Sequence, residues 1–252
     1  MIAAANAGAR ARLSAELGGP LLLADWERAL FLHFEVPRGQ LQPQVPYELD
    51  LLEGHAYVSL VFFTMRRMRL AHGGRLAEWL CGPLQEQRFL NLRTYVRHGE
   101  ETGIHFLAEW VSHWLCVQFG PLLYGLPYHW GRHDFQHDHE RRRLRGHVET
   151  RDADGFVEYE SAPEGARFET AEAGTLDAFL LERYMAFTGN RERRMCFRIW
   201  HEPWQQVGVR LERFEQTLLS AFAPWWKAAG FVSANYSLGV RDVWMGRPRR
   251  IR

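Results

Sequence analysis

The sequence predicts an α+β protein in which a large curled antiparallel β-sheet, or a barrel-like structure, packs against a few helices. Runs rich in β-branched and aromatic residues recur along the chain, and they outnumber the segments with helical periodicity. Most of these runs are joined by short turn-forming segments, which favours antiparallel neighbours. Aromatic residues make up 13% of the chain, so large side chains are available for a core that could also enclose a cavity.

Composition and length suggest one domain and exclude several classes of partner. No repeat or low-complexity linker divides the chain, so a single domain over residues 1–252 is expected, with residues 1–20 as a partly helical leader. A net charge of +1 argues against nucleic acid, and no apolar run is long enough for a membrane span. The three scattered cysteines fit a reducing cytoplasm and form no thiolate zinc motif. No cofactor is expected, and association into a homo-oligomer is left open.

The expected strands are, in chain order, residues 29–36, 56–65, 89–96, 103–108, 144–148, 156–160, 195–202, 207–214 and 240–245. The first is bounded by Pro37 and Gly39, and the second is β-branched and aromatic nearly throughout, as in a strand buried on both faces. The segments HGEETG and TRDADG are typical hairpin turns between the third and fourth and between the fifth and sixth strands. Pro203 and Trp204 separate the next two.

Three helices are expected between these strands. The first follows Ser112, a candidate N-cap, and ends near Gly120. The second, residues 176–187, follows the good N-cap Thr175 and carries apolar residues at helical spacing. The third, residues 218–229, is followed by a glycine that can close it.

Several short motifs occur in an order that resembles the YqjF-like proteins, a bacterial family of unknown function. They are NLRTYV (residues 91–96), LPYHW (126–130), TLDAFLLERY (175–184) and HEPW (201–204), together with the opening WERALFLHFEVP and the closing YSLGV. The resemblance covers almost the whole chain. That family is similar in turn to the acetoacetate decarboxylase fold, which implies a curled antiparallel structure around a central pocket.

The resemblance also implies that Schiff-base decarboxylation is absent. In acetoacetate decarboxylase the imine-forming lysine lies in a Pro-Lys-Lys segment, and LPYHW resembles that place with Tyr128 and His129 where the lysines would be. The glutamate of the decarboxylase corresponds approximately to Phe89. Imine chemistry needs an amine, and the single lysine, Lys227, lies in a predicted C-terminal helix where a solvated ammonium is the usual role.

The strand FLNLRTYV offers a polar face. By period-2 alternation Asn91, Arg93 and Tyr95 share one side of it. An arginine between Asn and Tyr on a strand facing a pocket could hold a carboxylate or enolate through two hydrogen bonds. The alternative is that Arg93 pairs with a structural acid such as Glu182 or faces water.

Two further candidates lie near the predicted helix and the HEPW motif. Glu182 could be a ligand-binding or catalytic carboxylate, although a structural ion pair that docks the helix onto the sheet is the simpler interpretation. His201 ends a strand and could act as an acid or base near neutral pH, or it could simply hydrogen-bond to a turn. His33, in FLHFEV, could be a hydrogen-bonded core histidine or a pocket residue.

The segment HWGRHDFQHDH gathers imidazoles and carboxylates at short spacing. His129, His133, His137 and His139 could bind Zn²⁺ or Fe²⁺, yet no HExxH or comparable motif is present, so a solvated strand beside a loop is the default.

The leading hypothesis is a cytoplasmic small-molecule-binding protein whose pocket receives Arg93, Tyr95, Tyr128, His129 and His201. As an enzyme it would perform acid–base chemistry on a small oxo or carboxylate compound, with Arg93 holding the anion and His129 or His201 moving protons. The competing hypothesis is a non-catalytic binder or sensor of an apolar ligand. It is supported by the many tryptophans and by the missing lysine and glutamate.

Overall fold

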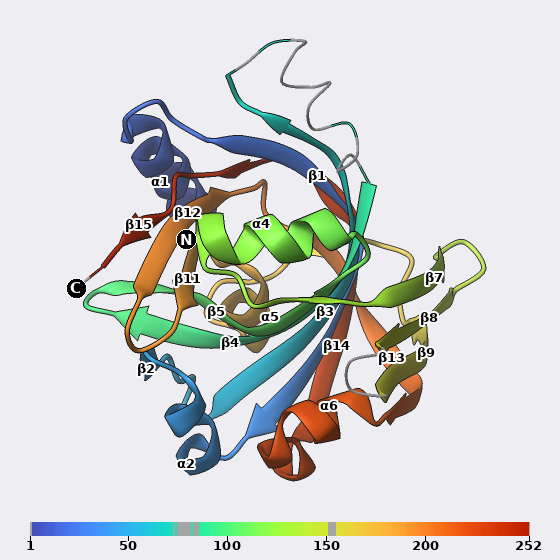
Figure 1. Ribbon diagram of the computed structural model, residues 1–252. Helices are drawn as coiled ribbons and strands as arrows, with labels where there is room; N and C mark the ends of the chain where they lie inside the picture. The colour runs from blue at the N-terminus through green and yellow to red at the C-terminus, as the bar shows by residue number, and fades with distance from the viewer. Residues whose placement is uncertain (1, 73, 75–81, 83–85, 151–154, 252) are drawn as a thin grey trace.

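A ring of strands forms the centre of the molecule. The computed structural model describes residues 2–72, 74, 82, 86–150 and 155–251. The ring consists of β14 (Gly230–Met245), β1 (Leu22–Val36), β3 (Ala56–Leu70), β4 (Glu86–His98), β5 (Glu101–Val111), β11 (Met185–Gly189) and β12 (Arg194–Trp200). It closes because β12 also pairs with β14 (Figure 1). All of these neighbours are antiparallel except β5 and β11, which run parallel.

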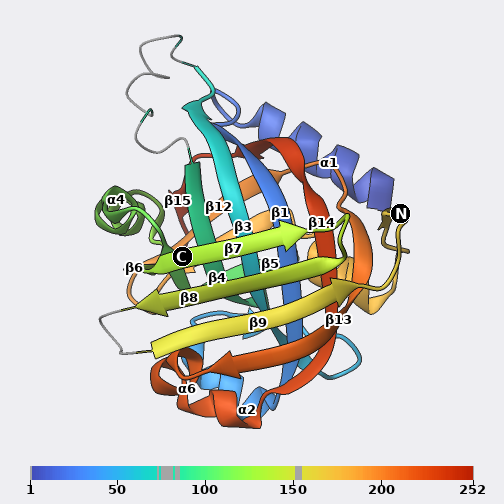
Figure 2. The ribbon, with the colours of Figure 1, turned by 90° about the vertical axis from the view of Figure 1, so that its right-hand side faces the viewer.

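A second layer of strands covers one side of the ring. From β14 the sheet continues through β13 (Gln205–Gln216), β9 (Gly155–Pro163), β8 (Arg143–Thr150) and β7 (Arg132–Asp138). Figure 2 shows β7, β8 and β9 lying across β1, β3 and β4. The ring strands on that side therefore have protein on both faces, which explains why β3 is apolar nearly throughout Ala56–Phe63.

Period-2 alternation divides the buried side chains between two cores. On β1, Leu30, Leu32 and Phe34 point outward into the core beneath the second layer, whereas Ala29 and Phe31 point into the ring. The strands β3 and β4 alternate in the same way. The interior of the ring is thus a separate core, and a polar residue on the inward face of these strands is enclosed by it.

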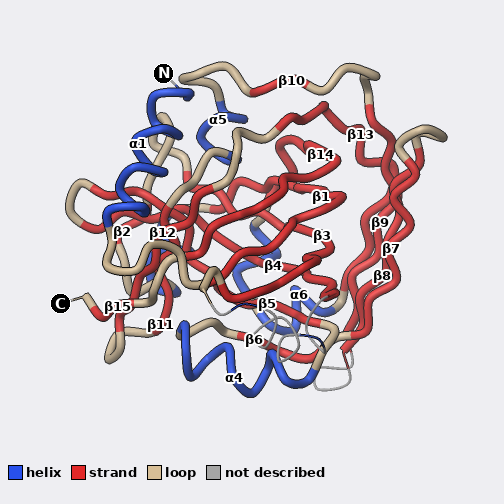
Figure 3. The backbone as a smooth tube through the Cα atoms, turned by 90° about the horizontal axis from the view of Figure 1, so that it is seen from above, coloured by secondary structure: helices blue, strands red, loops and turns tan. Residues whose placement is uncertain are grey.

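Two helices lie at opposite ends of the ring. The helix α4 (Trp114–Tyr124) lies across the end that faces the viewer in Figure 1, and α5 (Leu176–Leu181) lies at the far end, as the view from above confirms (Figure 3). The first helix, α1 (Ile2–Ala15), packs against β12. The remaining elements are α2 (Arg38–Leu41), η1 (Gln42–Gln44), β2 (Glu48–Leu49), β6 (Tyr128–Trp130), β10 (Glu169–Thr170), α6 (Leu218–Phe222), η3 (Pro224–Ala228) and β15 (Arg249–Arg250).

The predicted α+β fold class is confirmed, but several element boundaries differ. The expected helix over residues 176–187 ends after Leu181, and Met185–Gly189 is a strand instead. The expected last helix is two short pieces, α6 and η3, and the final strand begins at Gly230 rather than at residue 240. The helix expected to end at Gly120 continues to the left-handed cap Gly125, with His113 rather than Ser112 as its N-cap.

In the part of the chain that the structure describes, no helix is both long enough and apolar enough to cross a membrane.

Candidate functional site

A cavity of about 80 Å³ lies inside the ring. Most of its lining is apolar and includes Phe31, Phe63, Phe89 and Trp204, so little water surrounds any polar group placed there. The stacked pair Phe63 and Phe89, with ring centroids 4.9 Å apart, comes from the neighbouring strands β3 and β4. Four polar side chains share this lining: Asn91, Arg93, Glu109 and Tyr128.

Arg93 is the cation of the cavity. It is 8% exposed, and it comes from the inward face of β4 together with Asn91. Its Nη2 donates to the Leu180 carbonyl at 3.1 Å, and its guanidinium carbon lies 5.5 Å from the centre of the Phe31 ring. Its Nε has no hydrogen-bond partner among the described residues, and neither has Asn91 Oδ1. A buried charge with an unused donor is costly, because water cannot reach it.

Glu109 on β5 is the acid of the cavity. It is 2% exposed, and its Oε2 has no hydrogen-bond partner in the described part of the chain. Burial raises the pKa of the Glu109 carboxyl well above its usual value, although the positive charge of Arg93 opposes that shift. A carboxyl group in this state can stay protonated at neutral pH and donate a hydrogen bond, which an ionised carboxylate cannot do.

Tyr128 stands beside Glu109, because β6 and β5 are parallel and Glu109 is in register with Tyr128. Burial raises the pKa of the Tyr128 hydroxyl well above its usual value, with Glu109 adding to the shift. The tyrosine ring also supports α4, since a Cβ added at Gly120 would lie 2.3 Å from the ring. The hydroxyl therefore remains a neutral group in a fixed position.

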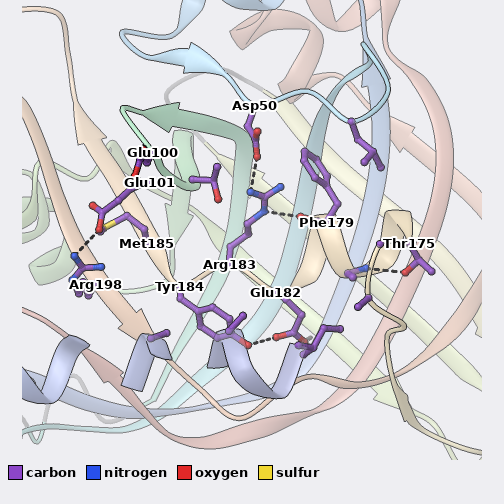
Figure 4. Close-up of a pocket in the computed structure, with 18 of the residues that line it drawn as sticks. Asp50, Glu100, Glu101, Thr175, Phe179, Glu182, Arg183, Tyr184, Met185 and Arg198 are labelled. Atoms are coloured by element: carbon purple, nitrogen blue, oxygen red, sulfur yellow. Dashed lines mark hydrogen bonds and ion pairs between the residues drawn. The ribbon is translucent and has the colours of Figure 1, made fainter. Parts of the chain in front are cut away.

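A larger hollow of about 670 Å³ lies outside the ring, between α1 and α5, and its charged groups are largely paired with one another (Figure 4). Arg183 Nη1 lies 2.7 Å from Asp50 Oδ2, and Arg198 Nη2 lies 2.6 Å from Glu101 Oε1. Glu182 accepts from the Tyr184 hydroxyl, and also from the backbone N–H of Trp204 at 2.9 Å. These groups already satisfy one another, so the hollow is a weaker candidate than the cavity despite its size.

The structure places the other predicted site residues outside the central cavity. Glu182 borders the outer hollow and ties the end of α5 to Trp204, and it is Arg183, not Glu182, that forms the buried ion pair there. Tyr95 is fully buried behind Arg93, where its hydroxyl contacts Ser59.

His201 lies behind the cavity wall. Its ring centroid is 5.2 Å from that of Trp204, and its Nδ1 donates to the Glu202 carbonyl at 2.8 Å. Burial lowers the pKa of His201 to about 4, with the charge of Arg93 contributing, so the ring is neutral at physiological pH.

His129 points away from Tyr128. Its ring lies 5.7 Å from Phe222 and 5.8 Å from Trp110, both on the outer side of the ring of strands. It therefore shares no cavity with Arg93.

The histidine-rich segment does not gather into a metal site. Along β7, His133 and His137 are buried; the Nδ1 atom of each contacts a backbone carbonyl, Gly131 and Arg28 respectively. Among the residues that the structure describes, no three His, Cys, Asp or Glu side chains lie where they could hold a metal ion together.

Sequence reasoning missed Glu109 because of a β-bulge. Ile104 and Phe106 face the interior, so simple alternation would turn Glu109 outward. The register with β4 passes from Phe106 to Ala108, which leaves Leu107 as an extra residue and reverses the alternation. A lone acid within the apolar run FLAEWV was the signal that could have found it.

Comparison with known proteins finds relatives of this chain in sequence and in structure. The family model DUF2071, described as an uncharacterized conserved protein, matches residues 23–229. A curated relative, the uncharacterized protein YqjF of Bacillus subtilis (strain 168), is 31% identical over 200 residues, which are 78% of this chain and 79% of that protein. The YqjF-like resemblance predicted from the sequence is therefore confirmed.

Solved structures share the fold. An acetoacetate decarboxylase-like enzyme from Sphingomonas wittichii RW1 superposes with a TM-score of 0.61 at 14% identity, covering 92% of this chain and 94% of that one. The enduracididine biosynthesis enzyme MppR complexed with pyruvate gives 0.62 at 11% identity, covering 94% and 92%. The acetoacetate decarboxylase-like fold is thus confirmed. No lysine lines the cavity described above, and Lys227 is exposed in η3.

Proposed function

The chain therefore belongs to the DUF2071 family of uncharacterized conserved proteins, and from that premise we propose that it binds a small oxo or carboxylate compound in its central cavity and acts on it by acid–base chemistry. The observation that carries the proposal is that Arg93 and Glu109 line the same apolar cavity, and that Arg93 Nε and Glu109 Oε2 have no hydrogen-bond partner among the described residues. Perturbed ionisable groups in such a cavity are a common mark of a functional site.

The roles follow from charge and protonation. Arg93 would hold the anionic end of the compound, because a guanidinium presents several N–H donors to a carboxylate or enolate in a dry environment. Glu109, whose pKa is raised by burial, would donate from its protonated form to the oxo oxygen and then, once ionised, could accept a proton from the adjacent carbon. Asn91 Oδ1 and the Tyr128 hydroxyl would orient the compound. Glu109 thus takes the part that the sequence suggested for His129 or His201.

The size of the cavity limits the compound. A water-sized group needs about 10–15 Å³ of cavity volume. The cavity of about 80 Å³ therefore accommodates roughly five to eight non-hydrogen atoms. Pyruvate falls in this range, and it is the ligand of one fold neighbour, MppR. Imine formation is not part of the proposal, since no lysine lines the cavity.

A second candidate is a binder of a small apolar ligand without turnover. It is favoured by the aromatic lining, in which Phe31 and Trp204 meet edge to face with centroids 5.2 Å apart. An apolar ligand would use this surface and leave Arg93 and Glu109 untouched.

Calorimetric titration with pyruvate and with its neutral analogue pyruvamide tests the binding step. We expect pyruvate to bind more tightly, and Arg93→Gln to weaken it by about tenfold to a hundredfold, because a hydrogen bond to a charged group contributes about 1.5–3 kcal/mol. Arg97→Gln is the matched control, since Arg97 lies on the same strand with about half of its side chain exposed. Equal affinity for both ligands, or an equal loss in both variants, would refute the anion site.

Proton transfer is tested separately by exchange of the pyruvate methyl hydrogens in heavy water, followed by proton NMR. We expect wild-type protein to accelerate the exchange and Glu109→Gln to abolish the acceleration while pyruvate still binds. Binding without exchange in the wild type would refute the acid–base step and leave only the binding of the anion.

A further inference from the structure

A line of buried polar side chains crosses the inside of the ring and is not used by the proposed chemistry. Tyr95, Ser59, His33 and Asn235 come from four neighbouring strands and are each at most 2% exposed. The Tyr95 hydroxyl lies 2.5 Å from Ser59 Oγ, Ser59 Oγ lies 2.7 Å from His33 Nδ1, and His33 Nε2 lies 3.1 Å from Asn235 Oδ1. We call this line, with its continuation below, the polar chain.

The polar chain continues to the surface and ends on α5. Asn235 Nδ2 donates to Gln206 Oε1 at 2.7 Å, and Gln206 Nε2 donates to Asp177 Oδ2 at 3.5 Å. Asp177 lies in the first turn of α5. The contact between Gln206 and Asp177 is the longest of these hydrogen bonds, and it attaches the polar chain to α5, the helix at the far end of the ring of strands.

The donors of the polar chain all point the same way. The Asp177 carboxylate can only accept, so Gln206 donates its amide to it and accepts from Asn235. Asn235 Oδ1 then accepts from His33 Nε2–H, which leaves Nδ1 as the acceptor for the Ser59 hydroxyl. Burial lowers the pKa of His33 to about 3, so the neutral ring that this order requires is its form at ordinary pH.

The other end of the polar chain returns to α5 beside Arg93. With its own hydrogen committed to His33, Ser59 must accept from the Tyr95 hydroxyl, whose single hydrogen is then shared between Ser59 Oγ and the Leu180 carbonyl, 3.0 Å away, in a three-centre hydrogen bond. The same carbonyl accepts from Arg93 Nη2 at 3.1 Å. Both ends of α5 are therefore tied to one hydrogen-bonded circuit, and the carbonyl that holds Arg93 belongs to it.

We propose that the polar chain from Tyr95 to Asp177 positions Arg93, by locking α5 so that the Leu180 carbonyl holds the guanidinium with its Nε directed for ligand binding. Tyr95, Ser59 and His33 are positioning residues in this arrangement and do not touch the ligand. The circuit carries no proton to the site, because the amides of Asn235 and Gln206 do not ionise. The link to ligand affinity rests on the function proposed above, whereas the ordering of Arg93 does not depend on it.

Tyr95→Phe tests the proposal, because it removes one hydroxyl and keeps the ring. Tyr236→Phe is the matched control. Tyr236 is also fully buried, but its hydroxyl has no hydrogen-bond partner in the described part of the chain, and its ring lies in the outer core. Two readouts are needed: the order parameter of the Arg93 Nε–H group by nitrogen-15 relaxation, with its signal assigned by its loss in Arg93→Lys, and the affinity for pyruvate by calorimetry.

We expect Tyr95→Phe to lower the order parameter of Arg93 Nε–H from about 0.85 toward 0.6, and to weaken pyruvate binding about tenfold, while Tyr236→Phe changes neither. Ser59→Ala breaks the polar chain one link further away, so it should produce the same loss, and the double variant with Tyr95→Phe should add nothing to it.

Unchanged order of Arg93 in Tyr95→Phe would overturn the proposal, and so would an equal loss of order in Tyr236→Phe, which would indicate general loosening. If wild-type protein binds neither pyruvate nor another small carboxylate, the proposed function fails, and the order parameter still decides whether the polar chain positions Arg93.

Discussion

Mild acid should destabilise this fold strongly, because histidines are buried in it as neutral rings. Burial is the main cause of a lowered pKa at five histidines of the described chain, with a value of about 3 for one and about 4 for the others. They are His33, His105, His133, His137 and His201. They are spread over β1, β5, β7 and the segment after β12, so no local adjustment can expose all of them while the fold persists.

The sign follows from proton uptake. In the unfolded chain these rings titrate near pH 6.5, whereas in the folded chain they stay neutral until about pH 4 or below, so the unfolded state binds more protons between these values. The stabilisation from neutral burial is fully present above pH 6.5 and is lost as the pH falls toward 4. Between pH 7 and pH 5 each of the five rings lowers the free energy of unfolding by slightly less than about 2 kcal/mol. Together they lower it by on the order of 9 kcal/mol.

Glu109 acts in the opposite direction. Its folded-state pKa is raised by burial, so unfolding releases a proton here and acidification favours the folded state, but one proton over two pH units contributes at most about 2.7 kcal/mol. The net loss between pH 7 and pH 5 is then on the order of 6 kcal/mol, a large fraction of the roughly 5–15 kcal/mol that holds a typical domain folded.

Urea unfolding followed by tryptophan fluorescence at half-unit steps from pH 7.5 to pH 5 measures this loss. Near pH 5.5 the slope of the free energy of unfolding against pH should correspond to an uptake of roughly four protons on unfolding. His105→Gln keeps a side-chain donor near the Phe187 carbonyl that His105 Nδ1 contacts, and it should lower the slope by about one proton. His72→Gln, at an exposed position, is the control for the substitution itself. A free energy of unfolding that stays within about 1 kcal/mol from pH 7 to pH 5 would refute the reasoning.

Two further substitutions probe single contacts by the same urea assay. Gly103→Ala would place a Cβ 2.3 Å from the Met185 carbonyl oxygen, between β5 and β11, and should cost at least about 1–3 kcal/mol, whereas Gly39→Ala, at a position with open space, should cost almost nothing. Asp50→Ala should cost about 3–5 kcal/mol, since it leaves the guanidinium of Arg183 buried without its carboxylate; adding Arg183→Met should recover part of the loss. If Gly103→Ala is as stable as Gly39→Ala, the steric argument at Gly103 is wrong. If adding Arg183→Met to Asp50→Ala recovers no stability, the argument from the buried ion pair is wrong.

The strands of the ring could be predicted because their signal is local. The segment AYVSLVFFTM predicts a strand buried on both faces, and β3 is buried on both faces over Ala56–Phe63. The segment after Thr175 misled for the opposite reason. Its apolar residues have helical spacing, yet after Leu181 the chain joins β11, which pairs with β5, a strand distant in sequence, as well as with the next strand, β12. Non-local pairing overrides local propensity there, and no pattern within the segment reveals it.

The residues of the candidate site also divide into those that a local pattern reveals and one that it does not, and their unpaired polar atoms indicate which ligand would satisfy them. Asn91 and Arg93 could be found because alternation on one strand places them together, whereas Glu109 could not, because the bulge at Leu107 reverses the phase. Once the structure brings them together, the unused Arg93 Nε and Glu109 Oε2 are a cost to the folded state. A ligand with a carboxylate for Arg93 and an oxo oxygen for a protonated Glu109 would satisfy both groups at once. A ligand that supplies only one of these groups, such as pyruvamide or acetate, should therefore raise the melting temperature less than pyruvate does at equal concentration.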